Sequence, residues 1–353
     1  MTTQLGAVSE ERQRFYEEIE THSLSPLWQR LHALVPKTPA TPAVPMKWDY
    51  DGVVRQHVFR AGDIVTAEEA ERRVLILENP GLPGSASITH SLYAGLQLVK
   101  PGEIARAHRH SQSALRFVIE GCGAYTAVDG ERTVMRPGDF VLTPSWRWHD
   151  HGNESNEPMV WLDGLDIPIL SFFDAGFAET GGTLSQQEQR PVGDSTVRYG
   201  NNMLPVDWKP GDLASPILNY PYERSRETLD VLARSGDPDI CHGHKLRFVN
   251  PASGGSPMPT IAAFIQLLPA GFSTAPYQST DGAVFTVVEG EGESEIGGIR
   301  ISWKPRDIFV APSWHPVVHR CRTTATLFSF SDRAVQEKLG IWREARGNSG
   351  EKR

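Results

Sequence analysis

The sequence predicts an all-β fold of two tandem β-barrels, preceded by a short helical N-terminal region. Short segments that alternate apolar and polar residues are separated by Gly, Pro and Asp, which is typical of strands joined by turns. The stretch 117–146 recurs in similar form as 285–314, which indicates a duplicated unit. The 32 glycines and 26 prolines of this 353-residue chain also favour turn-rich β structure over a helical bundle.

The N-terminal region is expected to form helices and then an extended arm. Ser9 is placed to cap a first helix, and Ser25-Pro26 starts a second one, because Ser favours the cap and Pro favours the first turn. The Pro-rich stretch 36–45 predicts an extended arm. Thr66 is placed to cap a further short helix.

The rest of the chain divides into two barrels and a connector. FVIEGCGAYTAVDGERTVMRPGDFVLTPSW (117–146) resembles FTVVEGEGESEIGGIRISWKPRDIFVAPSW (285–314), with one residue deleted. A loop-rich stretch with a single helical candidate separates the copies. The predicted boundaries are 1–68 for the N-terminal helices and arm, 69–166 for the first barrel, 167–240 for the connector, and 241–353 for the second barrel with a terminal helix.

Charge and cysteine content exclude several classes of protein. A net charge of −8 argues against a nucleic-acid partner. We expect no secretory signal and no membrane span, because no basic segment precedes an apolar run at the start and no apolar run is long enough. Cys122, Cys241 and Cys321 are widely spaced, which argues against a disulfide framework and favours a reducing cytoplasm.

Two histidines one residue apart open a candidate metal site. His108 and His110 lie on a predicted strand, so their side chains share one face. His149 lies on a later strand, which can return beside the first in an antiparallel barrel. We expect these three histidines to hold one metal ion.

The spacing around these histidines resembles the two sequence motifs of cupins. The matching residues are Gly102, His108, His110 and Gly121 for the first motif, and Gly138, Pro144, His149 and Asn153 for the second. The resemblance implies a bicupin, with two tandem jelly-roll barrels. The usual motif has a Glu four residues after its second His, and this chain has Ala114 there. The predicted site therefore has three neutral histidines and no carboxylate.

The second copy lacks the metal ligands. The positions that match the three histidines are Tyr277, Ser279 and Val317. We expect only the N-terminal barrel to bind metal, and the second barrel to support folding or assembly. His242 and His244 precede a strand of this copy without a third histidine at the right spacing.

A site of three histidines without a carboxylate predicts both the metal and the substrate. Three imidazoles on one face of an octahedron leave adjacent open positions, which suits non-haem Fe(II) and oxygen activation. Tetrahedral zinc stays open as an alternative. An aromatic acid with an ortho hydroxyl would bring the missing negative charge and fill two positions. The rival functions are a metal-dependent cupin isomerase or hydrolase, and a non-catalytic binding protein.

The whole chain resembles the gentisate 1,2-dioxygenase family of bicupins, which includes salicylate and 1-hydroxy-2-naphthoate dioxygenases. Matching stretches are ENP, YAGLQ, HRHSQSALRFVIEG, TPSWRWHDHGN and LRFVNPASGGSPMPTI. The resemblance implies Fe(II), O2, and cleavage between the carboxyl- and hydroxyl-bearing ring carbons. Gentisate (2,5-dihydroxybenzoate) would give maleylpyruvate; salicylate or 1-hydroxy-2-naphthoate is the alternative substrate. A homotetramer is also implied.

Side chains on the same faces as the ligands are candidates for catalysis and substrate binding. Arg116 has the strand parity of His108, and we expect it and Gln97 to stabilise negative charge that develops during the reaction. A structural ion pair and a core amide are the alternatives. Tyr93, Gly95 and Gln97 share one face and are expected to line the substrate pocket, with Gly95 leaving room for the ring.

Most of the other candidates depend on the resemblance. It implies that His151, two residues after His149, is an acid or base near the substrate hydroxyl; a surface histidine is the alternative. From its place on a predicted strand, Asp163 is expected to orient His151 or Arg116. The resemblance also implies that one of two adjacent arginines grips the substrate carboxylate, and we expect Arg72 rather than Arg73.

Overall fold

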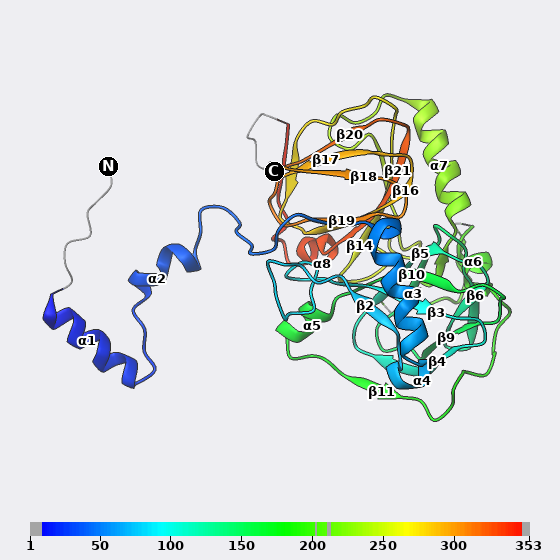
Figure 1. Cartoon of the computed structure of the whole chain (residues 1–353), viewed down its shortest axis with the longest axis horizontal. Helices are drawn as coiled ribbons and strands as arrows, with labels where there is room; N and C mark the ends of the chain where they lie inside the picture. The colour runs from blue at the N-terminus through cyan, green and yellow to red at the C-terminus, as the bar shows by residue number, and fades with distance from the viewer. Residues whose placement is uncertain (1–8, 202, 210–212, 348–353) are drawn as a thin grey trace. The chain divides into compact units, whose positions relative to one another are not determined.

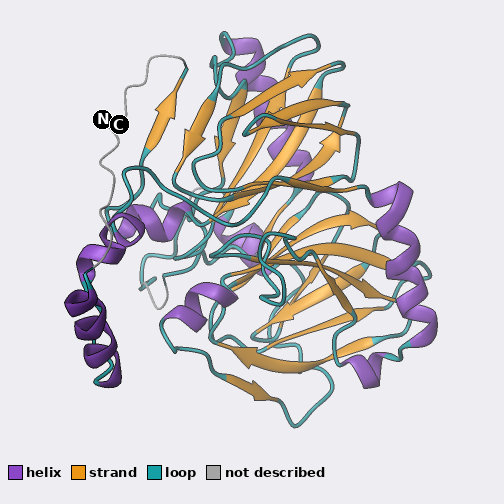
Figure 2. Cartoon of the chain, turned by 60° about the vertical axis from the view of Figure 1, so that its left-hand side comes forward, coloured by secondary structure: helices purple, strands orange, loops and turns teal. Residues whose placement is uncertain are grey.

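β-Strands form the interior of the larger of two units, Thr41–Arg353, and helices lie around them (Figure 2). The smaller unit is Met1–Ala40. The computed structural model describes residues 9–201, 203–209 and 213–347. The helices are α1 (Glu10–Thr21), α2 (Leu27–Leu34), the π-helical turn η1 (Tyr50–Val54), α3 (Arg55–Ile64), α4 (Ala67–Ala70), α5 (Ile167–Phe172), α6 (Asp194–Tyr199), α7 (Tyr222–Ser235) and α8 (Arg333–Lys338). None of these helices is long and apolar enough to cross a lipid bilayer.

The first barrel consists of two antiparallel sheets. One has the order β12 (Asn219–Tyr220), β8 (Phe140–Thr143), β5 (Ala114–Glu120), β10 (Met159–Leu165), β3 (Tyr93–Val99) and β2 (Val74–Ile76). The other has the order β11 (Ala178–Thr180), β4 (Ile104–His110), β9 (His149–Asn153), β6 (Ala124–Val128) and β7 (Glu131–Val134). Both lie in the lower half of Figure 1.

The second barrel repeats this arrangement. One sheet has the order β1 (Met46–Trp48), β19 (Ile308–Ala311), β16 (Ala283–Glu289), β21 (Ala325–Ser331), β14 (Ala262–Leu268) and β13 (His244–Arg247). The other has the order β18 (Ile299–Trp303), β17 (Gly292–Ile296), β20 (Val317–Cys321), β15 (Tyr277–Ser279) and β22 (Glu344–Arg346). The chain therefore has the all-β bicupin fold that the sequence predicts.

Segments outside the two repeats complete their sheets. β1 comes from the N-terminal arm but pairs with β19 of the second barrel, and Lys47 forms an ion pair with Asp307 at 3.2 Å. The connector contributes β11 and β12 to the first barrel, where they pair with β4 and β8. The arm and the connector are thus parts of the barrels as well as links between them.

The six-stranded sheets of the two barrels share one hydrophobic core. Leu115 and Phe117 of β5 belong to the same buried cluster as Phe328 and Phe330 of β21. The rings of Phe117 and Phe328 stack with their centroids 4.1 Å apart. Because burial of each aromatic ring contributes a few kcal/mol, this core fixes the two barrels against each other.

The two barrels keep the same strand register. His108 pairs with His149 in the first barrel, and Tyr277 pairs with Val317 in the second. This is the correspondence that the sequence repeat predicts. The register extends to Gln97 and Gln266, which occupy the same place in β3 and β14.

The expected helix starts at Ser9 and Thr66 are confirmed. Ser9 accepts a hydrogen bond from the N–H of Arg12 at 3.2 Å, and Thr66 accepts one from the N–H of Glu69 at 3.1 Å. Residues Tyr50–Val54 and Arg55–Ile64 also form a helical run, which the sequence pattern does not predict. Burial of its apolar side chains in the shared core, rather than strong helix propensity, accounts for this helical run.

Candidate metal centre

Three histidine side chains meet inside the first barrel. His108 and His110 lie two residues apart on β4, and His149 pairs with His108 from the adjacent strand β9. Each ring offers one nitrogen, and these three nitrogens all lie within 4.8 Å of one another. The strand parity read from the sequence therefore brings these three residues together.

Backbone carbonyl groups fix the orientation of each ring. Each Nδ1 lies 2.8–2.9 Å from a carbonyl oxygen; the pairs are His108 with Arg106, His110 with Gln112, and His149 with Arg147. A carbonyl oxygen only accepts, so each Nδ1 carries the proton and each Nε2 keeps its lone pair. Nε2 of His108 and Nε2 of His149 are buried without a hydrogen-bond partner among the described residues. Converging, unpartnered lone pairs fit a metal ion.

The donor set is uncharged. Burial lowers the pKa of His108 to about 3 and that of His110 to about 4, and it holds the pKa of His149 well below its usual value. Within the described chain, no Asp, Glu or Cys joins this group. Ala114, at the position of the missing glutamate, is buried. The three imidazoles would therefore leave the charge of a bound metal cation unbalanced.

Arg116 is buried next to the three histidines. It donates hydrogen bonds to Thr143 Oγ1 and to His151 Nε2, the latter at 2.9 Å, and its Nε lies 3.6 Å from Asp163 Oδ1. Burial lowers the pKa of Arg116 to about 10, so the guanidinium stays charged at neutral pH. Its charge lowers the pKa of all three metal-site histidines, although burial is the larger cause.

His151 is fully buried, and both of its ring nitrogens are hydrogen-bonded. Since Arg116 only donates, His151 Nε2 is the acceptor and Nδ1 carries the proton. Nδ1 then donates to Thr126 Oγ1 at 3.0 Å. His151 is therefore held as a neutral ring against Arg116, and its acceptor nitrogen is already occupied.

Asp163 lies directly opposite Arg116 in the β5–β10 ladder. Its Oδ1 accepts a hydrogen bond from Trp161 Nε1 at 3.0 Å. Burial raises the pKa of Asp163 to about 6, and the charge of Arg116 opposes that shift. The carboxylate thus compensates a buried guanidinium, which would be costly alone.

The predicted face of β3 is buried beside this network. Gln97 is 2 % exposed, and its side-chain amide has no hydrogen bond to another described residue. A Cβ on Gly95 would lie 2.8 Å from the Tyr93 hydroxyl and 2.5 Å from a methyl group of Val74. Part of the room that Gly95 leaves is therefore filled by this chain's own side chains.

The two adjacent arginines have different surroundings. Arg73 is buried, forms an ion pair with Glu103, and donates to the carbonyl of Val65 at 3.0 Å. The side chain of Arg72 has no hydrogen bond or ion pair with another described residue, and it lines a cavity of about 720 Å³ together with His108. Arg72 is thus a cation available in this cavity, which Arg106 also lines.

Three residues of the site were not identified from the sequence. Thr126 and Thr143 hold His151 and Arg116, and Trp161 donates to Asp163. The signal for Thr126 was its place in a strand directly opposite His151, which is known only once the register is fixed.

Comparison with known proteins agrees with this description. A model of the cupin domain matches residues 95–165. The chain is 55% identical over 344 residues to gentisate 1,2 dioxygenase 1 of Aquipseudomonas alcaligenes, covering 98% of this chain and 99% of the relative. It is 39% identical over 339 residues to a gentisate 1,2-dioxygenase of Streptomyces sp, covering 94% of each chain.

Solved structures give the same result over the whole fold. The structure of salicylate 1,2-dioxygenase from Pseudoaminobacter salicylatoxidans, in adducts with gentisate, matches with a TM-score of 0.92 and 34% identity. The match covers 99% of this chain and 97% of that chain. With the histidine triad, the bicupin fold and these relatives taken together, the chain belongs to the gentisate 1,2-dioxygenase family.

Proposed function

We propose that this protein is an Fe(II)-dependent dioxygenase that converts gentisate and O2 into maleylpyruvate, cleaving the ring between the carboxyl- and hydroxyl-bearing carbons. The observation that carries this proposal is a site of three neutral, converging imidazoles with no carboxylate. The 55% identity to a gentisate 1,2-dioxygenase supports gentisate over other acids.

Nε2 of His108, His110 and His149 would hold the iron. Nitrogen donors on one side of the ion suit non-haem Fe(II). When bound, Fe(II) supplies the redox chemistry by which O2 reacts with the aromatic acid. A doubly negative ortho-hydroxy acid would balance the charge that these neutral ligands leave.

Arg72 would bind the substrate carboxylate. It is free of protein partners among the described residues and lines the same cavity as His108. A guanidinium can donate two parallel hydrogen bonds to a carboxylate, which fixes its orientation as well as its distance. Tyr93 and Gly95 would shape the neighbouring wall.

Arg116 and Gln97 would stabilise negative charge that develops on oxygen during ring cleavage. Arg116 brings a fixed positive charge in a buried place, where electrostatic interactions are stronger than in water. Gln97 adds an amide without a competing protein partner. Asp163 and His151 would act as positioning residues, because each contacts Arg116.

Oxygen uptake by iron-loaded protein tests the proposal. Gentisate should be consumed with one O2 per molecule and give maleylpyruvate, faster than salicylate or 1-hydroxy-2-naphthoate. Consumption of salicylate in preference to gentisate would transfer the chain to the salicylate branch, to which the 34% identical relative belongs by name. No uptake with any ortho-hydroxy acid, at full iron content, would contradict the proposal.

Two further features of the protein in the cell belong to the same proposal. We propose a homotetramer: α1 and α2 have no buried residue, and Leu27, Trp28 and Leu34 are exposed there, so these helices offer apolar surface to other copies. Light scattering should give four times the mass of 39.1 kDa; a monomer would contradict this.

We also propose a cytoplasmic location, because Cys122, Cys241 and Cys321 are free thiols; recovery in the periplasmic fraction would contradict it.

A further inference from the structure

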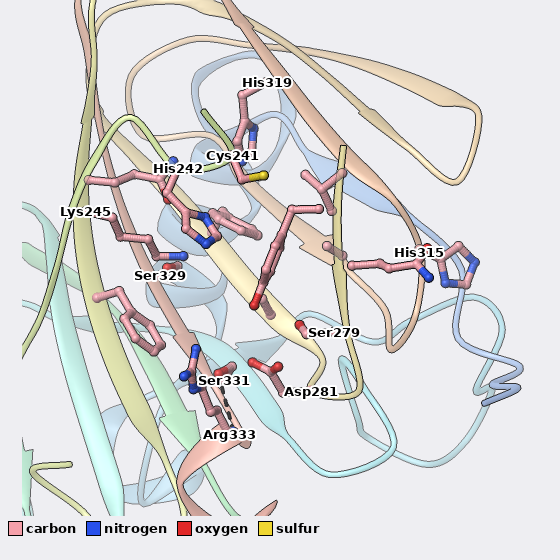
Figure 3. Close-up of a pocket in the computed structure, with 18 of the residues that line it drawn as sticks. Cys241, His242, Lys245, Ser279, Asp281, His315, His319, Ser329, Ser331 and Arg333 are labelled. Atoms are coloured by element: carbon pink, nitrogen blue, oxygen red, sulfur yellow. Dashed lines mark hydrogen bonds between the residues drawn. The ribbon is translucent and has the colours of Figure 1, made fainter. Parts of the chain in front are cut away.

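The second barrel contains a cavity of its own, although it has lost the metal ligands. The cavity measures about 270 Å³ and occupies the same place between the sheets as the metal site of the first barrel, with Tyr277 and Val317 on its wall. Figure 3 shows that polar side chains of several elements point into it. A barrel that served folding alone would be expected to fill this space with apolar side chains.

A positive charge without a protein partner lies in this cavity. Lys245 of β13 points into it (Figure 3), and its ammonium group makes no hydrogen bond or ion pair with another described residue. Its Nζ lies 4.8 Å from the centre of the Phe264 ring. Asp281 lines the same cavity but makes no ion pair with Lys245. An ammonium enclosed without an ion-pair partner is costly, so the site favours a negatively charged ligand.

The other charged side chains that line the cavity have polar contacts of their own, and Arg247 lies 3.8 Å from Glu337. Arg333 donates to Glu337 at 2.7 Å and stacks on Trp342. Asp281 accepts a hydrogen bond from Trp342 Nε1 at 2.9 Å. Neither group makes an ion pair with Lys245, so the charge of Lys245 is left for a ligand.

An amide donor lies beside this charge. Gln266 pairs with Lys245 directly across the β13–β14 ladder, so the two side chains are neighbours on one face. Gln266 is 2 % exposed, and its Nε2 is buried without a hydrogen-bond partner in the described chain. An ammonium and an amide N–H side by side provide two donors to the oxygens of one carboxylate.

Apolar side chains complete the wall. Phe285 takes the place that Arg116 has in the first barrel, and Val317 takes the place of His149. These two residues put hydrocarbon surface where the first barrel has a charged group and a histidine, and Phe264, at the position of Gly95, adds more. A cavity of this size is suited to one aromatic ring rather than to a larger ligand.

From these observations we infer that the second barrel binds a small aromatic monocarboxylate, with its carboxylate on Lys245 and Gln266 and its ring among Phe264, Phe285 and Val317. The ligand needs no metal, since the described residues of this barrel offer no group of three metal-binding side chains. The occupancy of such a site would follow the concentration of an aromatic acid, in the same chain that is proposed to cleave one. The binding itself does not depend on the proposed catalytic activity.

Binding of 4-fluorobenzoate, followed by ¹⁹F NMR and calorimetry, tests this inference. This probe lacks the ortho hydroxyl that a metal-chelating substrate needs. The iron-loaded wild-type protein should bind 4-fluorobenzoate. The Lys245→Met variant should bind it at least tenfold more weakly. Arg72→Gln, the matched change in the first barrel, should leave that binding within twofold of wild type.

Several outcomes would overturn the inference. Equal binding by wild type and Lys245→Met would do so, as would binding that is lost in Arg72→Gln and kept in Lys245→Met. Unchanged iron content and melting temperature would show that Lys245→Met is folded. If this variant does not fold, Gln266→Leu replaces it with an expected weakening of at least threefold, and a wild-type protein that binds no probe at millimolar concentration rejects the site directly.

Discussion

The two barrels share one framework and differ in the side chains that face their interiors. The first has His108, His149 and Arg116 where the second has Tyr277, Val317 and Phe285. Two interior positions hold the same residue type in both barrels, since Gln97 matches Gln266 and His151 matches His319. The two barrels therefore share their sheet register, while the chemistry of their interiors differs.

One matching pair is a buried histidine in each barrel. His151 follows His149 by two residues, and His319 follows Val317 by two residues. His151 contacts Thr126 at 3.0 Å, and its counterpart His319 contacts Ser294 at 2.7 Å. In each case a hydroxyl on the facing strand holds Nδ1. A buried histidine fixed by a neighbouring hydroxyl is therefore a property of the framework, and what its other nitrogen meets distinguishes the two barrels.

The largest expected difference between the barrels is metal binding. His149→Ala removes one of the three nitrogen donors, and we expect the iron content to fall below about 0.1 ion per chain, with oxygen uptake falling in parallel. His319→Ala, in the other barrel, should keep the wild-type iron content. Elemental analysis measures both. A normal iron content in His149→Ala would contradict the proposal that His149 is a metal ligand.

The buried arginine gives the next largest effect. In Arg116→Lys the planar guanidinium that reaches Thr143, His151 and Asp163 is lost, and we expect kcat for gentisate to fall about 100-fold with iron retained. Arg132→Lys is the matched control, because Arg132 pairs with exposed glutamates on the surface of the same barrel. A kcat that stays within twofold of wild type in Arg116→Lys would speak against the proposed role.

The adjacent arginines should separate binding from stability. Arg72→Gln is expected to raise KM for gentisate about 10- to 100-fold, since hydrogen bonds to a charged group contribute about 1.5–3 kcal/mol. Arg72→Lys should raise KM less. Arg73→Gln leaves Glu103 without its partner and should lower the free energy of unfolding by about 3 kcal/mol. Steady-state kinetics and urea unfolding measure these effects, and an exchange of the two phenotypes would assign the carboxylate to Arg73.

The smallest effect concerns pH and the second barrel. Burial lowers the pKa of Lys245 to about 8, with Asp281 opposing the shift and Arg333 adding to it. His242 and His319 have pKa values of about 3 and stay neutral above pH 5. The charged form of Lys245 exists below its pKa, so fluorobenzoate binding should be constant below pH 7 and weaken about tenfold by pH 9. Affinity that does not change over this range would contradict a role for the ammonium.

The sequence predicted that His108, His110 and His149 come together, because their positions depend only on strand parity and on two motifs. The helix starts at Ser9 and Thr66 were also predictable, since each is a local contact between a side chain and an N–H three residues later. The duplication predicted the second barrel and its missing ligands. All of these features follow from residues that are close in sequence or related by the repeat.

The contacts around Arg116 could not be predicted in the same way. Thr143 and His151 reach it from different strands, 27 and 35 residues away along the chain, and a shift of one residue would turn either side chain to the other face. The different surroundings of Arg72 and Arg73 were also hidden, because Glu103 lies 30 residues from Arg73. The cavity of the second barrel could not be predicted, because the absence of metal ligands does not show whether the other side chains fill the interior.

The pairing of β1 with β19 has a consequence for biosynthesis. Lys47 and its partner Asp307 are 260 residues apart, and at about 5–20 residues per second a ribosome needs on the order of tens of seconds to make the intervening chain. During that time the earliest strand has no neighbour, although it is only Met46–Trp48 in length. Its shortness limits the exposed edge that a nascent polypeptide offers to other chains, and the second barrel can be sealed only after nearly the whole protein has been translated.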